Sequence, residues 1–239
     1  MNNLKKLLAA LLALTMVFAL ACPALAADFP ENTFADVQRS DWFAEAVDCM
    51  QATEIMKGVG DNRFDPYGQV TRAMVVTVLY RLAADDSGRL PDVSGKKNPF
   101  QDVSNADSNW YRDPVIWAVD AGVTKGTGPD TFSPETPITR EQMASMIVRF
   151  MLSVSEDSAG ILDEIASADP DGNVVFEMLK KEFSDAGSIS DYARLNVAIC
   201  KLGGIMKGDP EGTFRPQATL IRAECAQIFL NLYKIGTQG

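Results

Sequence analysis

Three copies of one sequence unit constrain this chain more than any other feature. The segments 42–72, 110–140 and 192–222 align with one another without a gap. Their identical positions include a lysine-glycine pair, a phenylalanine, a proline and a closing arginine: Lys57, Lys125 and Lys207; Gly58, Gly126 and Gly208; Phe64, Phe132 and Phe214; Pro66, Pro134 and Pro216; Arg72, Arg140 and Arg222. Such a chain is expected to fold by packing like units together.

Each copy predicts two helices joined by a loop. Apolar residues recur at spacings of three and four after the aromatic residue that opens the copy, which predicts an amphipathic first helix. The second helix follows the arginine and repeats the i, i+3, i+4, i+7 pattern: Val75, Val78, Leu79 and Leu82; Met143, Met146, Ile147 and Phe150; Cys225, Ile228, Phe229 and Leu232. The intervening segment is rich in Gly, Asp, Pro and Asn, which favours turns, and its phenylalanine is expected to attach the loop to the core.

One helix pair cannot bury both of its apolar stripes alone, so the copies must share a core. We therefore predict an all-α fold in which three pseudo-symmetric helix-loop-helix repeats pack around a central helical bundle as one domain. The expected boundaries are a signal peptide at 1–26, repeats at 34–83, 100–151 and 183–233, a linker at 84–99, and a partly helical linker or insertion at 152–182.

The residue before each second helix predicts where that helix starts. Thr139 followed by Gln142 has the capping-box pattern, and Thr71 can cap without a reciprocal partner. Ile221 stands at the same position in the third copy and has no side-chain acceptor. That helix is therefore expected to begin earlier, with Thr219 as its cap.

The first 26 residues have the pattern of an export signal. Lys5 and Lys6 precede an apolar run over residues 7–21, which is shorter than the roughly 20 residues that span a bilayer. We expect cleavage after Ala26 and a secreted protein without a membrane span. Lipidation at Cys22 is the alternative.

Composition argues against several classes of function. The chain has 22 basic and 32 acidic residues, a net charge of −10 that becomes −12 once the expected cleavage removes two lysines. No nucleic-acid partner is expected, because binding to that backbone requires a basic face. The absence of histidine removes histidine-based nucleophilic, acid-base and metal sites. We expect no enzymatic activity and no cofactor.

The cysteines and one acidic loop are the remaining candidates for special chemistry. Cys200 and Cys225 align with core positions, so buried thiols are expected, with a disulfide between them as the alternative. The segment 169–173 is similar to a calcium loop, but its glycine comes too early and Lys180 stands where the closing glutamate should be. No metal site is predicted.

The third copy carries a family resemblance. Its segment Lys207-Gly208-Asp209-Pro210-Glu211-Gly212-Thr213-Phe214-Arg215-Pro216, followed by Ile221-Arg222-Ala223-Glu224, resembles the S-layer homology repeat. The family's Thr-Arg-Ala-Glu signature is incomplete in all three copies. The resemblance implies a protein of the cell wall or surface S-layer, held noncovalently by anionic, pyruvylated secondary cell-wall polysaccharide in grooves between repeats.

The resemblance also implies which residues bind the polysaccharide. The signature arginines would contact its carboxylate, and an arginine fork on the first turn of a helix suits an anion. The candidates are Arg72, Arg140, Arg222, Lys57, Lys125, Lys207, Gly58, Gly126, Gly208, Glu224, Trp42 and Trp110. Alternatively, the arginines stabilise repeat interfaces, the Lys-Gly pairs end helices, and the tryptophans cover the core.

Two other functions stay open. The chain could be a structural S-layer-associated subunit that self-assembles or bridges envelope proteins. It could also be a glycosidase with paired carboxylates, although the repeats leave no separate catalytic domain to supply them. We rank wall anchoring first.

Overall fold

The computed structural model describes residues 29–85, 87–155 and 158–237, so the expected cleavage site at Ala26 and the alternative lipidation site at Cys22 lie outside the described residues. The described chain divides into two compact units. We call residues 29–138 with 219–230 the N-terminal unit, and residues 139–218 with 231–237 the C-terminal unit. No helix in these ranges has the length and hydropathy needed to cross a bilayer.

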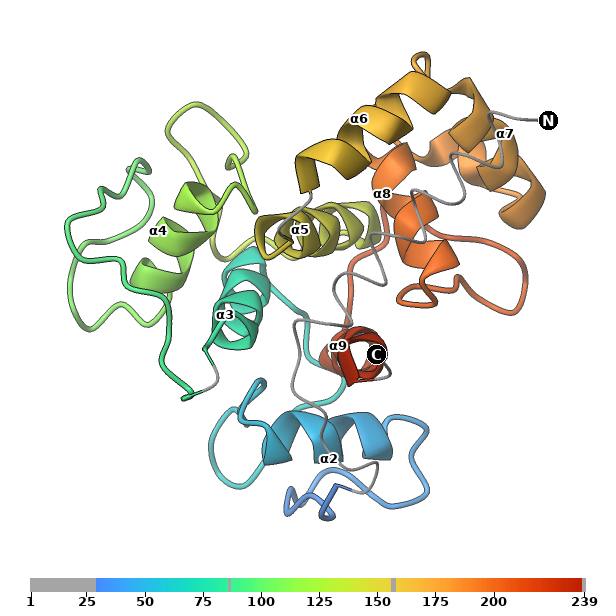
Figure 1. The fold of residues 1–239 in the computed structure, drawn as a ribbon. Coiled ribbons are helices and arrows are strands. Elements are labelled where there is room, and N and C mark those ends of the chain that lie inside the picture. The colour runs from blue at the N-terminus through green and yellow to red at the C-terminus, as the bar shows by residue number, and fades with distance from the viewer. Residues whose placement is uncertain (1–28, 86, 156–157, 238–239) are drawn as a thin grey trace. The chain divides into compact units, whose positions relative to one another are not determined.

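The N-terminal unit holds the first repeat and the beginning of the second. Its helices are α2 (Ala44–Ala52), α3 (Arg72–Leu82), α4 (Arg112–Asp120) and the first part of α9 (Arg222–Thr237). α3 and α4 pack against each other (Figure 1). Tyr80 and Trp117 meet there with ring centroids 5.5 Å apart.

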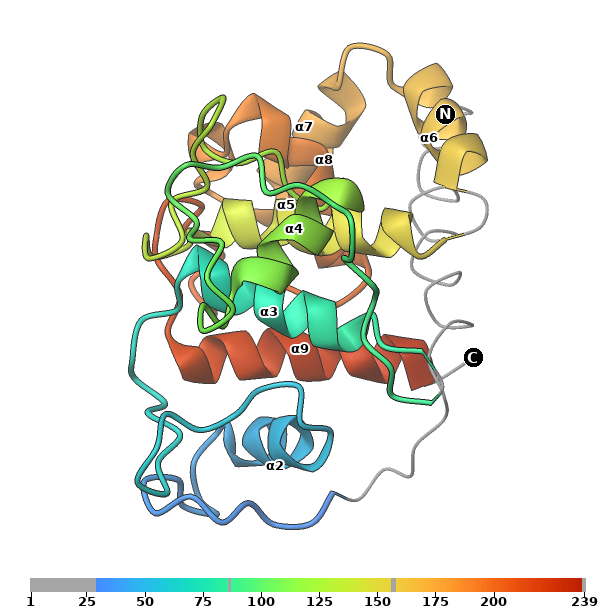
Figure 2. The same cartoon turned by 90° about the vertical axis from the view of Figure 1, so that its left-hand side faces the viewer.

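The C-terminal unit holds the other described helices. These are α5 (Arg140–Ser153), α6 (Ser158–Ala168), α7 (Asn173–Glu182), the short 3-10 helix η1 (Ala186–Ser188), α8 (Asp191–Leu202) and the end of α9. α8 packs against both α5 and α7 (Figure 2). α6 and α7 lie within the segment expected to be a partly helical insertion.

The predicted all-α class, with helix-loop-helix repeats, is confirmed. The described residues contain helices and isolated bridges but no extended strand. The repeat pairs are α2 with α3, α4 with α5, and α8 with α9. The loop phenylalanines Phe64, Phe132 and Phe214 are fully buried, which confirms that they attach the loops to the core.

A closed ring of backbone hydrogen bonds joins the ends of the three repeat loops inside the N-terminal unit. The Ile138 amide donates to the Val70 carbonyl (2.9 Å), the Leu220 amide to Ile138 (3.3 Å), and the Val70 amide to Leu220 (3.0 Å). All three side chains are buried. Each repeat therefore supplies one equivalent residue to a pseudo-threefold junction, and the ring satisfies one amide and one carbonyl of each.

Two of the three predicted helix starts are confirmed and one is wrong. Thr139 and Gln142 form the capping box, and the Thr71 hydroxyl accepts from the Met74 amide. α9, however, begins at Arg222 in register with α3 and α5, rather than earlier with Thr219 as its cap. The Glu224 carboxylate accepts the Ile221 amide at 3.1 Å, so the carboxylate half of a capping box is present at this helix start although the hydroxyl half is missing.

The described cysteines are buried free thiols, as expected. Cys49, Cys200 and Cys225 form no disulfide. Burial raises the pKa of Cys225 to about 12, and it raises the pKa of Cys200 as well. Thiols held in this way are poor nucleophiles at neutral pH.

Candidate functional site

Each signature arginine reaches from the start of a second helix to the loop of the next repeat. The Nε atoms of Arg72, Arg140 and Arg222 donate to the carbonyls of Phe132 (2.9 Å), Phe214 (2.7 Å) and Phe64 (2.7 Å). Each guanidinium also lies over the same phenylalanine ring, 4.6 to 5.2 Å from its centroid. All three arginines are buried, so they join neighbouring repeats, which is the alternative role that the sequence left open for them.

The first backbone amides of α3, α5 and α9 are hydrogen-bonded to other parts of the protein. The amides of Arg72, Arg140 and Arg222 donate to loop carbonyls of the next repeat at 2.9 to 3.0 Å, and the amide after each arginine donates to another carbonyl of the same loop at 2.8 to 3.1 Å. These amides are therefore not available to an external anion. Any anion binding at these positions must rely on side chains.

A repeated aspartate holds the loop carbonyl that each arginine uses. The Asp36 carboxylate accepts the amides of Phe64 and Asp65, both at 2.8 Å. Asp102 and Asp185 accept the equivalent amide pairs of the other two loops. The residue after each phenylalanine has a positive φ of 55° to 59°, a conformation that costs a non-glycine residue energy. Each aspartate thus fixes a strained turn and positions the acceptor for an arginine.

The Asp36 contact predicts a loss of stability in acid. Burial acts to raise the pKa of Asp36, but the Phe64 and Asp65 amides and nearby Arg63 lower it below the usual value. The stability that the ionised Asp36 carboxylate contributes is therefore fully present above about pH 4, the pKa of this group in the unfolded chain. It is lost as the pH falls through the lower pKa of the folded state. Urea unfolding at pH 6 and pH 3 should show a smaller drop in stability for Asp36→Asn than for wild type, with the exposed-acid variant Asp171→Asn as control. An equal drop in all three proteins would contradict the role of Asp36.

The N-terminal unit has a cavity of about 360 Å³ beside Arg222, which we call the Arg222 groove. All three repeats contribute to it: Arg222 from the third, Lys57 and Gly58 from the first, and Trp110 from the second. Arg222 Nη2 donates to the Lys57 carbonyl at 2.9 Å, which ties the arginine to the Lys-Gly turn. The remaining lining residues are Met56, Val59, Val70, Met74, Thr77, Val78, Arg81 and Cys225.

Three cationic side chains line this groove in a chain that is acidic overall. Burial lowers the pKa of Arg222, against the opposing effects of Cys225, Asp65 and Asp36, but a guanidinium stays protonated at neutral pH. Arg81 is the third cation, and sequence analysis missed it. The repeat alignment contains a pattern that could have identified it. The residue nine positions after the signature arginine is an arginine in the first two copies, Arg81 and Arg149, and an asparagine, Asn231, in the third.

The predicted glycines have a packing role. A Cβ at Gly58 would lie 2.6 Å from the Phe34 ring and 2.7 Å from the Arg63 carbonyl. A Cβ added at Gly126 or Gly208 would lie similarly close to a loop carbonyl and to the phenylalanine that precedes the first helix of the repeat, Phe100 or Phe183. Both glycines have positive φ. These glycines therefore let the Lys-Gly turn contact the segment before the first helix.

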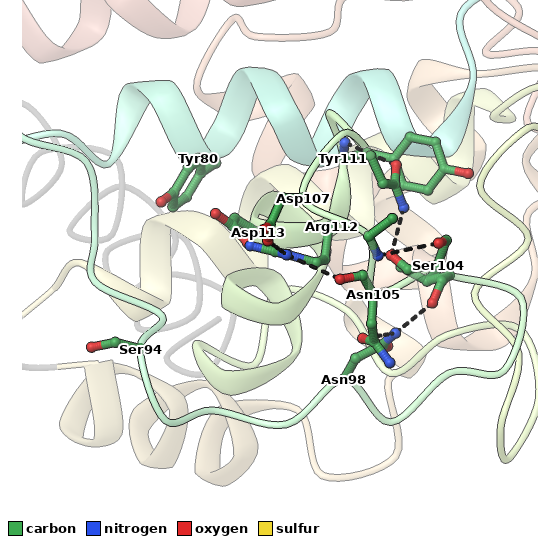
Figure 3. A network of polar contacts seen from close by, with 12 residues as sticks. Tyr80, Ser94, Asn98, Ser104, Asn105, Asp107, Tyr111, Arg112 and Asp113 are labelled. Atoms are coloured by element: carbon green, nitrogen blue, oxygen red, sulfur yellow. Dashed lines mark hydrogen bonds and ion pairs between the residues drawn. The ribbon is translucent and has the colours of Figure 1, made fainter.

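A polar network holds the loop that carries Trp110 (Figure 3). Arg112 donates to the Asn105 carbonyl (3.0 Å) and to Asp113 (2.8 Å), and it pairs with Asp107. The Asn109 amide group donates to the Ser104 carbonyl at 2.9 Å. These contacts satisfy Arg112 with the protein's own groups, and the segment that they tie together carries Trp110, which is 53% exposed.

The other predicted residues occupy different surroundings. Trp42 is exposed and lines a separate polar cavity with Arg39 and Asp48. Lys125 and Lys207 are exposed. Glu224 caps α9, as described above. Across the described ranges, no group of three or more Cys, Asp or Glu side chains is arranged to hold a metal ion.

Comparison with known proteins gives one family and several long relatives. The model of the S-layer homology domain matches residues 33–73, 99–144 and 182–226. An endoglucanase of Bacillus sp. strain KSM-635 is 27% identical over 97% of this chain, and an S-layer protein of Bacillus thuringiensis subsp. finitimus is 27% identical over 99%. The S-layer protein sap of Bacillus anthracis is 32% identical over 62%.

The chain corresponds to a small part of each of these relatives. It covers 22% of the endoglucanase, 25% of the Bacillus thuringiensis protein and 17% of the Bacillus anthracis protein. The matched regions fall on the three repeats that the sequence alone defines.

Proposed function

Because the chain belongs to the S-layer homology family, we propose that it anchors noncovalently to the cell wall by binding anionic, pyruvylated secondary cell-wall polysaccharide. Family membership places it at the cell surface. The Arg222 groove is the proposed binding site, and the corresponding positions of Arg72 and Arg140 are further candidates. The proposal includes no catalytic step.

One observation carries this proposal: Arg222, Lys57 and Trp110 line the same cavity although they come from three repeats. Guanidinium and ammonium groups bind a carboxylate through charge-assisted hydrogen bonds. An exposed indole offers a flat face to a sugar ring. The apolar side chains that line the groove suit the non-polar face or a methyl group of a ligand. Such a cavity fits an acid-bearing sugar.

The acidity of the whole chain is compatible with an acidic ligand. At physiological ionic strength, exposed charges more than roughly 8 Å away are largely screened, so the cations lining the groove dominate its local potential. If the corresponding positions of the other repeats also bind, one polymer chain would engage several weak sites and gain avidity.

A pull-down on purified wall sacculi tests the proposal. The full chain should pellet with sacculi and stay in solution when the polysaccharide has been stripped from them. The double variant Lys57→Gln, Trp110→Ala should bind at least about tenfold more weakly, because it loses a charged donor and the indole face. Both side chains are largely exposed, so the fold should survive.

The control is Tyr67→Ala, which removes an aromatic side chain that is 69% exposed and does not line the groove. It should pellet like the wild type. Retention on stripped sacculi, or full retention of the double variant, would contradict the proposal.

The second candidate function is a self-assembling or bridging envelope subunit, since two of the relatives are named S-layer proteins. It predicts sheets or filaments in electron micrographs of the purified chain without polysaccharide. A monomer by light scattering would contradict self-assembly.

A further inference from the structure

Glu54 occupies a backbone position where the other two repeats have glycine. Its φ is +55°, and the aligned residues Gly122 and Gly204 have φ of 74° and 71°. Glycine adopts this left-handed conformation without cost, whereas a glutamate pays a steric penalty for its Cβ. Strained backbone positions cluster at functional sites, which directs attention to what the Glu54 side chain contacts.

The side chain of Glu54 lies beside the cations of the Arg222 groove. Its Oε2 is 3.4 Å from Nζ of Lys57, and both side chains are mostly exposed. Arg81 approaches the same turn, where its Nη1 donates to the Ile55 carbonyl at 2.9 Å. Glu54 also acts electrostatically on Arg81, counteracting part of the pKa lowering that burial causes in this arginine.

We propose that Glu54 is a specificity-determining residue of the Arg222 groove, a built-in carboxylate that competes with the acid group of the ligand for Lys57. This inference rests on the proposed function, because it takes an anionic sugar as the ligand of the groove. In the second and third repeats a glycine takes the place of this carboxylate beside Lys125 and Lys207. The Arg222 groove therefore binds an acidic sugar more weakly than its cations alone would allow.

The size of the effect follows from the exposure of the pair. An exposed ion pair is weak and exchanges readily, so a ligand carboxylate can displace Glu54 from Lys57. Removing the competing charge should strengthen binding about two- to fivefold, and more at low salt than at high salt. If Glu54 instead only held Lys57 in place for the ligand, its removal would weaken binding.

The test is calorimetric titration of the full chain with a monosaccharide that bears a pyruvate ketal, and with its uncharged methyl ester. Glu54→Gln keeps the shape and the backbone conformation, and should bind the acid about two- to fivefold more tightly while leaving the affinity for the ester unchanged. Glu54→Gly, which copies the other repeats, should do the same. The gain should vanish when Lys57→Gln is added.

Glu177→Gln is the matched control. It breaks another Glu–Lys pair with i, i+3 spacing, between Glu177 and Lys180 at 2.5 Å on α7, and should leave the affinity for the acid unchanged. Unchanged or weaker acid binding by Glu54→Gln, alongside normal wild-type binding, overturns the role of Glu54 but leaves the proposed function intact. Failure of the wild type and of Glu54→Gln to bind the acid removes both.

Discussion

Arg222→Ala is expected to lower the free energy of unfolding by about 3 to 5 kcal/mol and to weaken retention on wall sacculi at least about tenfold. The alanine leaves the carbonyls of Phe64 and Lys57 without the guanidinium donors that now reach them at 2.7 and 2.9 Å. It also removes the cation from the Phe64 ring and from the groove. Urea unfolding followed by circular dichroism measures the first effect, and the sacculi pull-down measures the second.

Arg222→Lys separates charge from geometry. A lysine keeps a cation at the groove but lacks the planar fork that joins Phe64 to Lys57, so it should recover only part of the stability. Arg89→Ala, which truncates an exposed arginine of the same unit, should stay near wild type in both measurements. A stability of Arg222→Ala equal to that of wild type would show that the contact between repeats contributes nothing.

Gly126→Ala is expected to lower stability by about 3 kcal/mol or more, a fall of about 6 to 12 °C in the melting temperature for a chain of this size. Gly126 has a φ of +82°, and an added Cβ would lie 2.5 Å from the Thr131 carbonyl oxygen and 2.6 Å from the Phe100 ring. A backbone oxygen cannot move aside as a flexible side chain can. The Lys-Gly turn would have to leave the loop that it packs against.

Gly122→Ala provides the comparison within the same turn region. Gly122 has a φ of +74°, but no atom lies within 4 Å of the place that an added Cβ would take. Alanine there carries only the conformational cost of about 1 to 2 kcal/mol. The difference between the two variants therefore measures the packing contact alone. Equal melting temperatures for the two would refute the packing role assigned to Gly126.

Local patterns predicted much of this fold correctly. The apolar spacing that marks Val75, Val78 and Leu79 places one face of α3 in the core, and Thr139 with Gln142 fixes the start of α5. These predictions succeed because each depends on residues within one or two helical turns. The predicted start of α9 was wrong because the missing hydroxyl of Ile221 was considered without the carboxylate of Glu224 three residues later.

The sequence by itself determined that the chain consists of three equivalent helix-loop-helix repeats, because identity at fixed spacing requires no knowledge of distant contacts. Only the tertiary structure decided what the repeated arginines do, since Arg222 meets the Lys57 carbonyl across 165 residues of chain. Only it placed Arg81 and Trp110 in the same groove, and Arg81 close enough to Glu54 for the two charges to interact. The physical reason is that the potential and the shape of a cavity depend on which distant side chains folding brings together.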